Sequence, residues 1–234
     1  GLGSGYSLHG ETWEWDGVTW ARRDVNGPSP RYYHAMAYDS SRRVTVLFGG
    51  FGSAGGETWE WNGSTWTQRL VSGPSPRFLH AMAYDAARGV TVLFGGWNGS
   101  IDNGETWEWD GSTWTQRPVS GPSARYGHAM TYDTARGVIV LFGGFDDQTW
   151  EWNGATWTQR LATGPSRRSD HAMAFDSARG VTILCGGWKG SQSTDEVWEW
   201  NGVVWTQRTL NIPTPRYRHA MAFDKARARM VVFG

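Results

Sequence analysis

The chain has 234 residues with 22 basic and 22 acidic side chains, so its formal net charge is zero and its isoelectric point is about 7.2. A chain without a basic excess is not expected to bind nucleic acid or an anionic membrane, and no apolar run approaches the roughly 18 to 20 residues that span a bilayer. The single cysteine, Cys185, excludes an internal disulfide and is expected to be a buried thiol. No signal peptide is recognisable, and the sequence identifies no compartment.

The first 23 residues contain a glycine-rich loop followed by a predicted hairpin. Residues 11–15 read Glu-Thr-Trp-Glu-Trp, and Asp16-Gly17 separates them from a second segment that contains Trp20. An Asp-Gly or Asn-Gly pair between two strand-like segments is a strong hairpin signal. The Trp-Glu-Trp motif recurs with spacings of 46, 48, 43 and 48 residues, beginning at Trp13, Trp59, Trp107, Trp150 and Trp198.

The next stretch contains a complete repeat, which we divide into strands A to D. Residues 34–38 alternate large and small side chains and predict strand A, and the β-branched and apolar residues 43–48 predict a strand B that is buried on both faces. Residues 57–61 and 65–69 predict strands C and D. An Asp-x-x-Arg turn joins A to B, paired glycines end B, and an Asn-Gly turn joins C to D. No segment has helical periodicity.

Strand A begins with His-Ala-Met in every repeat, at His34, His80, His128, His171 and His219. A period of this length is typical of propellers and helical arrays, and the strand pattern favours the propeller. We predict one domain of five repeats over about 24–69, 70–117, 118–160, 161–208 and 209–234, the last being completed by residues 1–23.

The repeat resembles that of the kelch family over the whole chain. The resemblance rests on the paired glycines after strand B, on a Pro-X-Arg or Pro-Arg segment before strand A, and on the tryptophan of strand D. These tryptophans are Trp20, Trp66, Trp114, Trp157 and Trp205. The resemblance implies a fold and a binding function rather than a chemistry. Together with four strands per repeat, it predicts an all-β fold: a five-bladed β-propeller of four-stranded antiparallel blades.

The fifth blade is predicted to be composite, with strands A and B in residues 219–234 and strands C and D in residues 11–23. Phe233-Gly234 joined to Gly1-Leu2 restores the motif that ends strand B elsewhere. Pairing of the N- and C-terminal strands would close the ring and remove exposed sheet edges. We expect a monomer, with a blade-swapped dimer as the alternative.

Residues that recur in every repeat are expected to form the scaffold. Three tryptophans per repeat recur and are expected to pack between blades. The five registered histidines are expected to be structural and bonded to a neighbouring blade, the alternative being a ring of metal ligands. Asp39-x-x-Arg42 and its counterparts are expected to brace the A–B turn.

The glutamate between the paired tryptophans needs a partner if it is buried. A set of registered arginines, each three residues before a histidine, is the expected partner. These are Arg31, Arg77, Arg125, Arg168 and Arg216. The alternative is that the arginines surround an anion-binding mouth.

Function is expected on one face of the ring. In an A-B-C-D meander the D–A and B–C connections lie on one face, which we call the loop face, and the short turns lie on the other. The turns are uniform, whereas the B–C loops differ in length and sequence; variable loops on a rigid scaffold often carry function, although these loops could simply have drifted. Trp97 and Trp188 lie in these loops outside the repeat pattern. We predict one ligand-binding site formed by Tyr33, Trp97, Phe145, Asp170, Trp188 and Arg218.

The sequence contains no recognisable catalytic arrangement, so we predict no catalytic residue, no cofactor and no metal. Copper-carrying kelch-like oxidases need a Tyr–Cys pair, whereas Cys185 lies in a predicted strand. We predict a non-enzymatic scaffold that binds a protein or peptide segment. A carbohydrate-binding, lectin-like propeller is one alternative, although a lectin should have several equivalent pockets. An engineered or recently amplified propeller without a defined ligand is the other.

Overall fold

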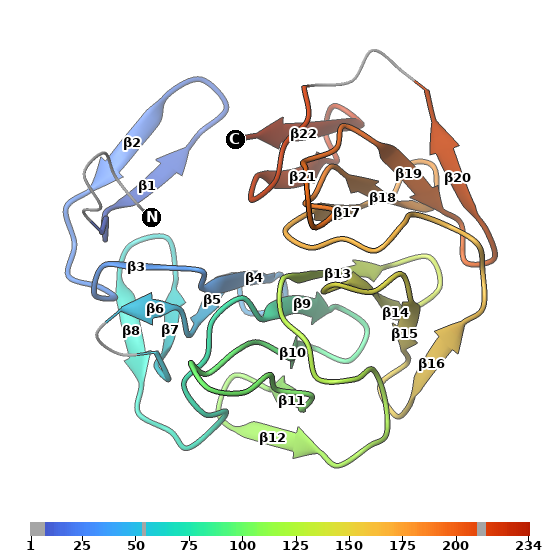
Figure 1. The fold of residues 1–234 in the computed structure, drawn as a ribbon. Coiled ribbons are helices and arrows are strands. Elements are labelled where there is room, and N and C mark those ends of the chain that lie inside the picture. Colours follow the sequence, from blue (N-terminus) through green and yellow to red (C-terminus); the bar gives the residue numbers. More distant parts are fainter. Residues whose placement is uncertain (1–7, 53–54, 210–213) are drawn as a thin grey trace.

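The computed structural model describes residues 8–52, 55–209 and 214–234. These residues form 22 β-strands and no helix, so they contain no helix that could cross a membrane. Four repeats each form a four-stranded antiparallel sheet with the strands in meander order, as predicted. We call these sheets blades 1 to 4 in chain order (Figure 1).

The blades are built from sixteen strands. Blade 1 contains β4 (Ala35–Asp39), β5 (Val44–Phe48), β7 (Thr58–Trp61) and β8 (Trp66–Arg69). Blade 2 contains β9 (Ala81–Asp85), β10 (Val90–Phe94), β11 (Thr106–Trp109) and β12 (Trp114–Arg117). Blade 3 contains β13 (His128–Asp133), β14 (Val138–Gly143), β15 (Thr149–Trp152) and β16 (Trp157–Arg160). Blade 4 contains β17 (Ala172–Asp176), β18 (Val181–Cys185), β19 (Val197–Trp200) and β20 (Trp205–Arg208).

The remaining strands form three two-stranded sheets. They are β1 (Thr12–Trp15) with β2 (Trp20–Arg23), β3 (Arg31–Tyr32) with β6 (Phe51–Gly52), and β21 (Ala220–Asp224) with β22 (Arg229–Phe233). The first and last of these pairs are the strands expected to share a composite blade. In the described residues they are separate sheets, and Figure 1 shows a space between them. The closed ring therefore stays a prediction, and the join through Gly1-Leu2 lies outside the described residues.

The predicted turn chemistry is confirmed on the short-turn face. The Asp85 carboxylate accepts the backbone N–H groups of Ala87 and Arg88 and the Nε–H of Arg88 at 2.7 Å, so it braces the A–B turn. Asp110 accepts the backbone N–H groups of Ser112 and Thr113 in the C–D turn. Because both ends of each turn are bonded locally, these turns set the register of the strands that they join.

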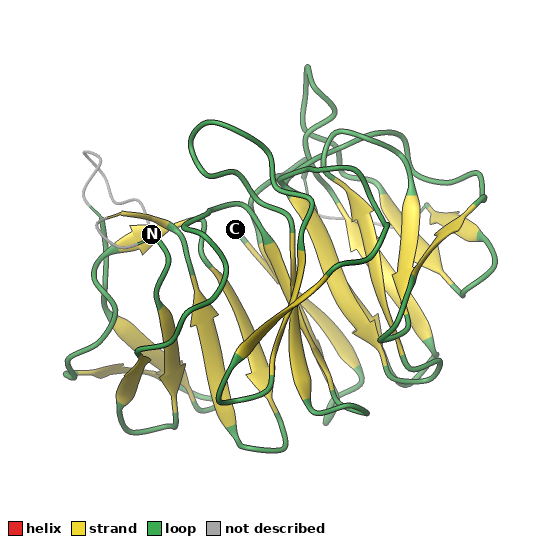
Figure 2. Ribbon diagram, turned by 90° about the horizontal axis from the view of Figure 1, so that it is seen from below, coloured by secondary structure: helices red, strands yellow, loops and turns green. Residues whose placement is uncertain are grey.

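The hydrophobic core lies between neighbouring blades. Phe94 of blade 2 packs edge-on against His128 and Trp157 of blade 3, with ring centroids 5.6 and 5.3 Å apart. Val92 and Ile139 join the same buried cluster. Equivalent clusters join blade 1 to blade 2 and blade 3 to blade 4. The inner strands β4, β9, β13, β17 and β21 are consecutive neighbours, and Figure 2 shows the longer loops at one end of the strands and the short turns at the other.

Candidate functional site

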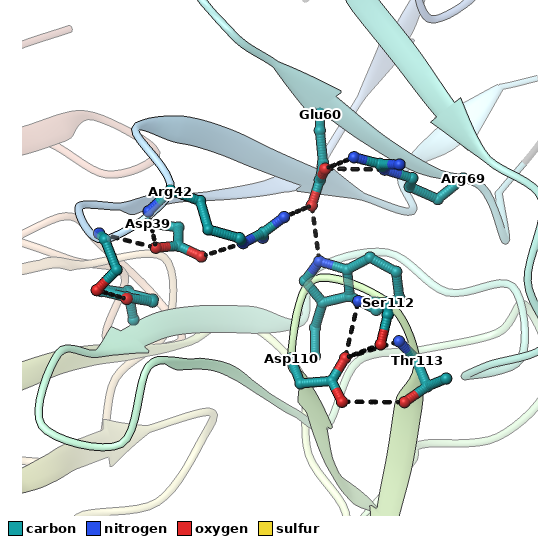
Figure 3. A network of polar contacts seen from close by, with 10 residues as sticks. Asp39, Arg42, Glu60, Arg69, Asp110, Ser112 and Thr113 are labelled. Carbon is teal, nitrogen blue, oxygen red and sulfur yellow. Dashed lines mark hydrogen bonds and ion pairs between the residues drawn. The ribbon is translucent and has the colours of Figure 1, made fainter.

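The recurring polar residues form a network that joins blades (Figure 3). Glu60 of β7 is 2% exposed, and its carboxylate accepts hydrogen bonds from Arg42 (2.6 Å), from Arg69 (2.6 Å) and from the indole N–H of Trp109 in the next blade (2.9 Å). Arg42 also donates to Asp39. Burial alone would raise the pKa of Glu60, but the bonds from Trp109 and the arginines outweigh it and hold the pKa below its ordinary value.

The prediction that the registered arginines bond these glutamates is therefore wrong. Arg77 is 1% exposed and instead donates to the Gly95 carbonyl at 3.1 Å and to Glu105 at 2.5 Å, within its own repeat. The glutamate is reached by the arginine of the A–B turn and by the one that ends strand D, because both lie beside strand C. The alternative of an anion-binding mouth also loses its basis, since four of the five registered arginines are buried and bonded to a backbone carbonyl. These are Arg31, Arg77, Arg125 and Arg168.

The five registered histidines line one cavity between the inner strands, which we call the central channel. The imidazole of His128 packs on the preceding blade so closely that a Cβ at Gly95 would lie 2.7 Å from its Cε1 atom. Neither of its ring nitrogens has a hydrogen-bond partner among the described residues, so the expected bond to a neighbouring blade is not found and the contact with that blade is packing alone. Burial, with Arg125 nearby, lowers the pKa of His128 to about 3, so this imidazole is neutral at pH 7. In the described residues no group of three or more His, Cys, Asp or Glu side chains is arranged to hold a metal.

One residue from each repeat forms a rim at the loop-face end of the channel. These residues precede the registered histidines and are Tyr33, Leu79, Gly127, Asp170 and Arg218. All five have positive φ angles between 53° and 67°. The N–H of each donates to the carbonyl of the rim residue before it, from Leu79 to Arg218, at 2.8 to 3.0 Å. Left-handed backbone at non-glycine residues is a strained conformation that clusters at functional sites.

The rim is also connected across its two ends. The Arg218 guanidinium lies 4.9 Å from the ring centroid of Tyr33 and 5.4 Å from that of Tyr217, which are cation–π distances. Its Nε lies 3.7 Å from the Asp170 carboxylate, a loose ion pair. Burial raises the pKa of Asp170, and Arg218 offsets part of that rise. The rim and the registered histidines line a cavity of about 270 Å³ that is open to solvent.

Outside the rim, aromatic side chains follow one another around the loop face. They form an arc of Tyr32, Phe51, Phe78, Trp97, Tyr126 and Phe145, with successive ring centroids 5.1, 5.4, 5.3, 6.2 and 5.2 Å apart. Trp188 and Tyr217 form a further pair at 5.3 Å. A cavity of about 300 Å³ lies between the end of the arc and this pair. Aromatic rings at these spacings attract one another beyond their buried area.

The structure brings all six predicted site residues to the loop face. Phe145, Asp170, Trp188 and Arg218 line the 300 Å³ cavity, and Tyr33 contacts Arg218. Trp97 lies further along the arc, stacked on Tyr126. Their role in binding stays a prediction.

Sequence reasoning missed four residues that line the same cavity: Leu79, Tyr126, Ser169 and Tyr217. Leu79 directly precedes a registered histidine, and the other three directly follow a registered arginine. The two residues between each registered arginine and histidine vary from repeat to repeat. Both of these positions, and not the second alone, could therefore have been included in the predicted site.

Two further acidic groups of the loop face are paired. Asp146 lies 2.7 Å from Arg125, and Glu196 bonds both Arg168 and Lys189.

No protein-family model matches the chain, and no curated protein matches it in sequence.

Proposed function

We propose that this chain is a non-enzymatic scaffold that binds a peptide segment of a partner protein on its loop face. The observation that carries the proposal is the aromatic surface around the channel mouth. Phe51, Phe145 and Tyr217 are 50%, 41% and 43% exposed, and they lie beside the rim. The short-turn end of the inner strands also has a cavity, of about 350 Å³, but its aromatic residues are Tyr or Phe at the same position of every repeat, as expected for scaffold. They are Tyr38, Tyr84, Tyr132, Phe175 and Phe223. Aromatic rings with few polar partners are typical of protein recognition surfaces.

Two further features support a peptide over a sugar. The rim residues differ in every repeat, so the face presents one composite site and not a set of equivalent pockets. The resemblance to kelch repeats points in the same direction, since that family binds protein segments through its loops. A catalytic role has less support, because Asp146 and Glu196 are held in ion pairs by neighbouring side chains.

The proposal is tested by selecting from a displayed library of random peptides on the immobilised chain. The same selection is run on the Trp97→Ala/Trp188→Ala variant, and a glycan array is probed in parallel. We expect enriched peptides that bind the variant at least about tenfold more weakly, which is about 1.4 kcal/mol, while its thermal unfolding stays cooperative. Peptides that bind both proteins equally would refute the site. Binding to glycans alone would replace the peptide proposal with the lectin-like one.

We also propose that the scaffold is a closed five-bladed propeller, in which β21–β22 and β1–β2 complete one blade. Two exposed faces support this. Phe233 and Val231 occupy the positions of the buried Phe94 and Val92 but are 84% and 50% exposed. On the other side of the gap, Met36 is 49% exposed where Met82 is 7% exposed.

The second face contains a socket that matches the first. A cavity of about 350 Å³ is lined by His34, Met36, Leu47 and Trp66, the counterparts of the residues that surround Phe48 in the next interface. Trp15 and Glu199 form a second complementary pair, an indole donor and a carboxylate acceptor. Trp15 is 49% exposed, and among the described residues Glu199 lacks the indole donor that reaches Glu60.

The closure is tested with Phe233→Ser, and Leu161→Ser at a 92% exposed position is the matched control. If Phe233 fills the socket, the variant loses about 3 kcal/mol of unfolding free energy, whereas the control stays within about 0.5 kcal/mol. Equal, small effects in both variants would refute the closure. Light scattering separates the monomer from the blade-swapped dimer, because a dimer mass would contradict closure within one chain.

A further inference from the structure

The aromatic surface of the loop face alternates between two positions of the repeat. One is the residue after the registered arginine, and the other is the residue after the paired glycines. The first position holds Tyr32, Phe78, Tyr126, Ser169 and Tyr217, and the second holds Phe51, Trp97, Phe145 and Trp188. Ser169 is the one position of these nine without an aromatic ring, and it separates the arc from the Trp188–Tyr217 pair.

A second side chain is missing beside Ser169. Gly127 occupies the rim position that holds Tyr33, Leu79, Asp170 or Arg218 in the other repeats. A Cβ at Gly127 would lie 3.2 Å from the Cβ of Ser169, so the two small residues face each other across the blade 3–blade 4 boundary. At the blade 1–blade 2 boundary the same two positions hold Tyr33 and Phe78, whose rings stack at 6.3 Å with an interplanar angle of 18°.

The resulting cavity has walls of aromatic side chains. It measures about 300 Å³ and is lined by Tyr126, Phe145, Trp188 and Tyr217, with the buried Ser169 among its lining residues. Phe145 is 41% exposed and Tyr217 is 43% exposed, so solvent reaches these walls. The chain itself shows which group suits this place, because the equivalent position is filled by a tyrosine or phenylalanine ring in the other four repeats.

The polar groups of the cavity suit a ring that carries a hydroxyl group. Asp170 and Arg218 both line it. The nearest partners of the Asp170 carboxylate are Arg218 at 3.7 Å and the Ser169 hydroxyl at 3.4 Å, both longer than an ordinary hydrogen bond to a carboxylate. Asp170 therefore keeps capacity to accept a hydrogen bond from a phenol.

We propose that this cavity, which we call the Ser169 socket, binds one aromatic side chain of the partner peptide, with tyrosine preferred over phenylalanine. The ligand ring stacks among Tyr126, Phe145 and Trp188 and takes the place that the chain's own Tyr or Phe occupies in the other repeats. Its hydroxyl group donates to Asp170. This inference rests on the proposed peptide-binding function and names the anchor residue that the site selects.

The probe for this proposal is N-acetyl-L-tyrosinamide, titrated onto the full chain by calorimetry or by protein-detected NMR. The non-aromatic shape control is N-acetyl-cyclohexylalaninamide. Three variants are compared with the parent chain. Ser169→Phe fills the socket with the ring found in the other repeats, Ser169→Ala leaves it open, and Phe145→Ala removes a wall that is already half exposed.

We expect saturable binding of the tyrosine probe that Ser169→Ala changes less than about twofold. Ser169→Phe should weaken it at least about tenfold, and Phe145→Ala by about fivefold, the loss of one aromatic contact. Equal binding by the parent chain and Ser169→Phe, or binding of the cyclohexyl control as tight as the tyrosine probe, would overturn the proposal. If Ser169→Phe does not fold, Phe145→Ala decides, and an unchanged affinity there overturns it.

The outcome separates this inference from the proposed function. Peptides selected on the parent chain that lose affinity for Trp97→Ala/Trp188→Ala but not for Ser169→Phe would leave the binding face intact and refute the socket. Absence of any selected peptide would refute both.

Discussion

Removing the charge of Glu108 tests whether the glutamate network holds neighbouring blades together. Glu108 is 3% exposed and accepts hydrogen bonds from Arg88 (2.6 Å), Arg117 (2.7 Å) and Trp152 of blade 3 (3.2 Å). Glu108→Gln keeps the volume of the side chain but removes its charge. Breaking a buried ion pair from one side costs about 3 to 5 kcal/mol, and the partial exposure of both arginines places the expected loss near 3 kcal/mol. For a chain of this length that loss lowers the melting temperature by roughly 6 to 12 °C.

The matched control for this prediction is Glu14→Gln. Glu14 of β1 bonds Arg23 and Trp61 in the same way, but its side chain is 32% exposed. While β1–β2 is a separate sheet, its ion pair is worth less than about 1 kcal/mol because water screens it. Urea unfolding followed by tryptophan fluorescence gives both free energies. A loss below about 1 kcal/mol for Glu108→Gln would refute the structural role assigned to the network, whereas equal losses of about 3 kcal/mol in both variants would indicate that the closed blade proposed above covers Glu14.

Two further predictions concern buried titratable groups. Burial lowers the pKa of His128 and His171 to about 3 and that of His34 to about 4. Between pH 6.5 and these values the unfolded chain therefore binds more protons than the folded chain. The free energy of unfolding falls as the pH falls through this range. Each imidazole should cost about 1 kcal/mol between pH 6.5 and 5.5 in urea unfolding, and an unchanged free energy would show that the imidazoles reach solvent. Burial also raises the pKa of Cys185, so a disulfide reagent at pH 8 should label it only after unfolding, and rapid labelling of the native chain would contradict its burial.

Much of the fold could be predicted because the repeats can be compared with one another within the one chain. Constant spacing separated the scaffold residues from the variable ones, and turn pairs such as Asp110-Gly111 located the hairpins. The partners of the scaffold charges could not be predicted in this way. The sequence alone does not show whether Arg31 or Arg42 bonds Glu60. In the folded meander Arg42 lies beside Glu60, whereas Arg31 donates to Glu57 and to the Gly49 carbonyl.

The candidate site was predicted in part for the same reason. Trp97 and Trp188 stood out because they break the repeat pattern. Tyr126 and Tyr217 were missed because an aromatic residue in a variable position does not attract notice by itself. Ser169 was missed because its significance is the absence of a ring, which becomes meaningful only when the neighbouring rings are seen to form an arc.

The central claim is that the loop face binds and the short-turn face supports it. The most direct test is a ¹H–¹⁵N NMR titration of the indole N–H signals with the tightest peptide from the library selection. We predict that the signals of Trp97 and Trp188 shift, whereas those of Trp109, Trp152 and Trp200, whose indoles are bonded to glutamates between blades, do not. Shifts confined to Trp109, Trp152 and Trp200, with Trp97 and Trp188 unchanged, would contradict the account.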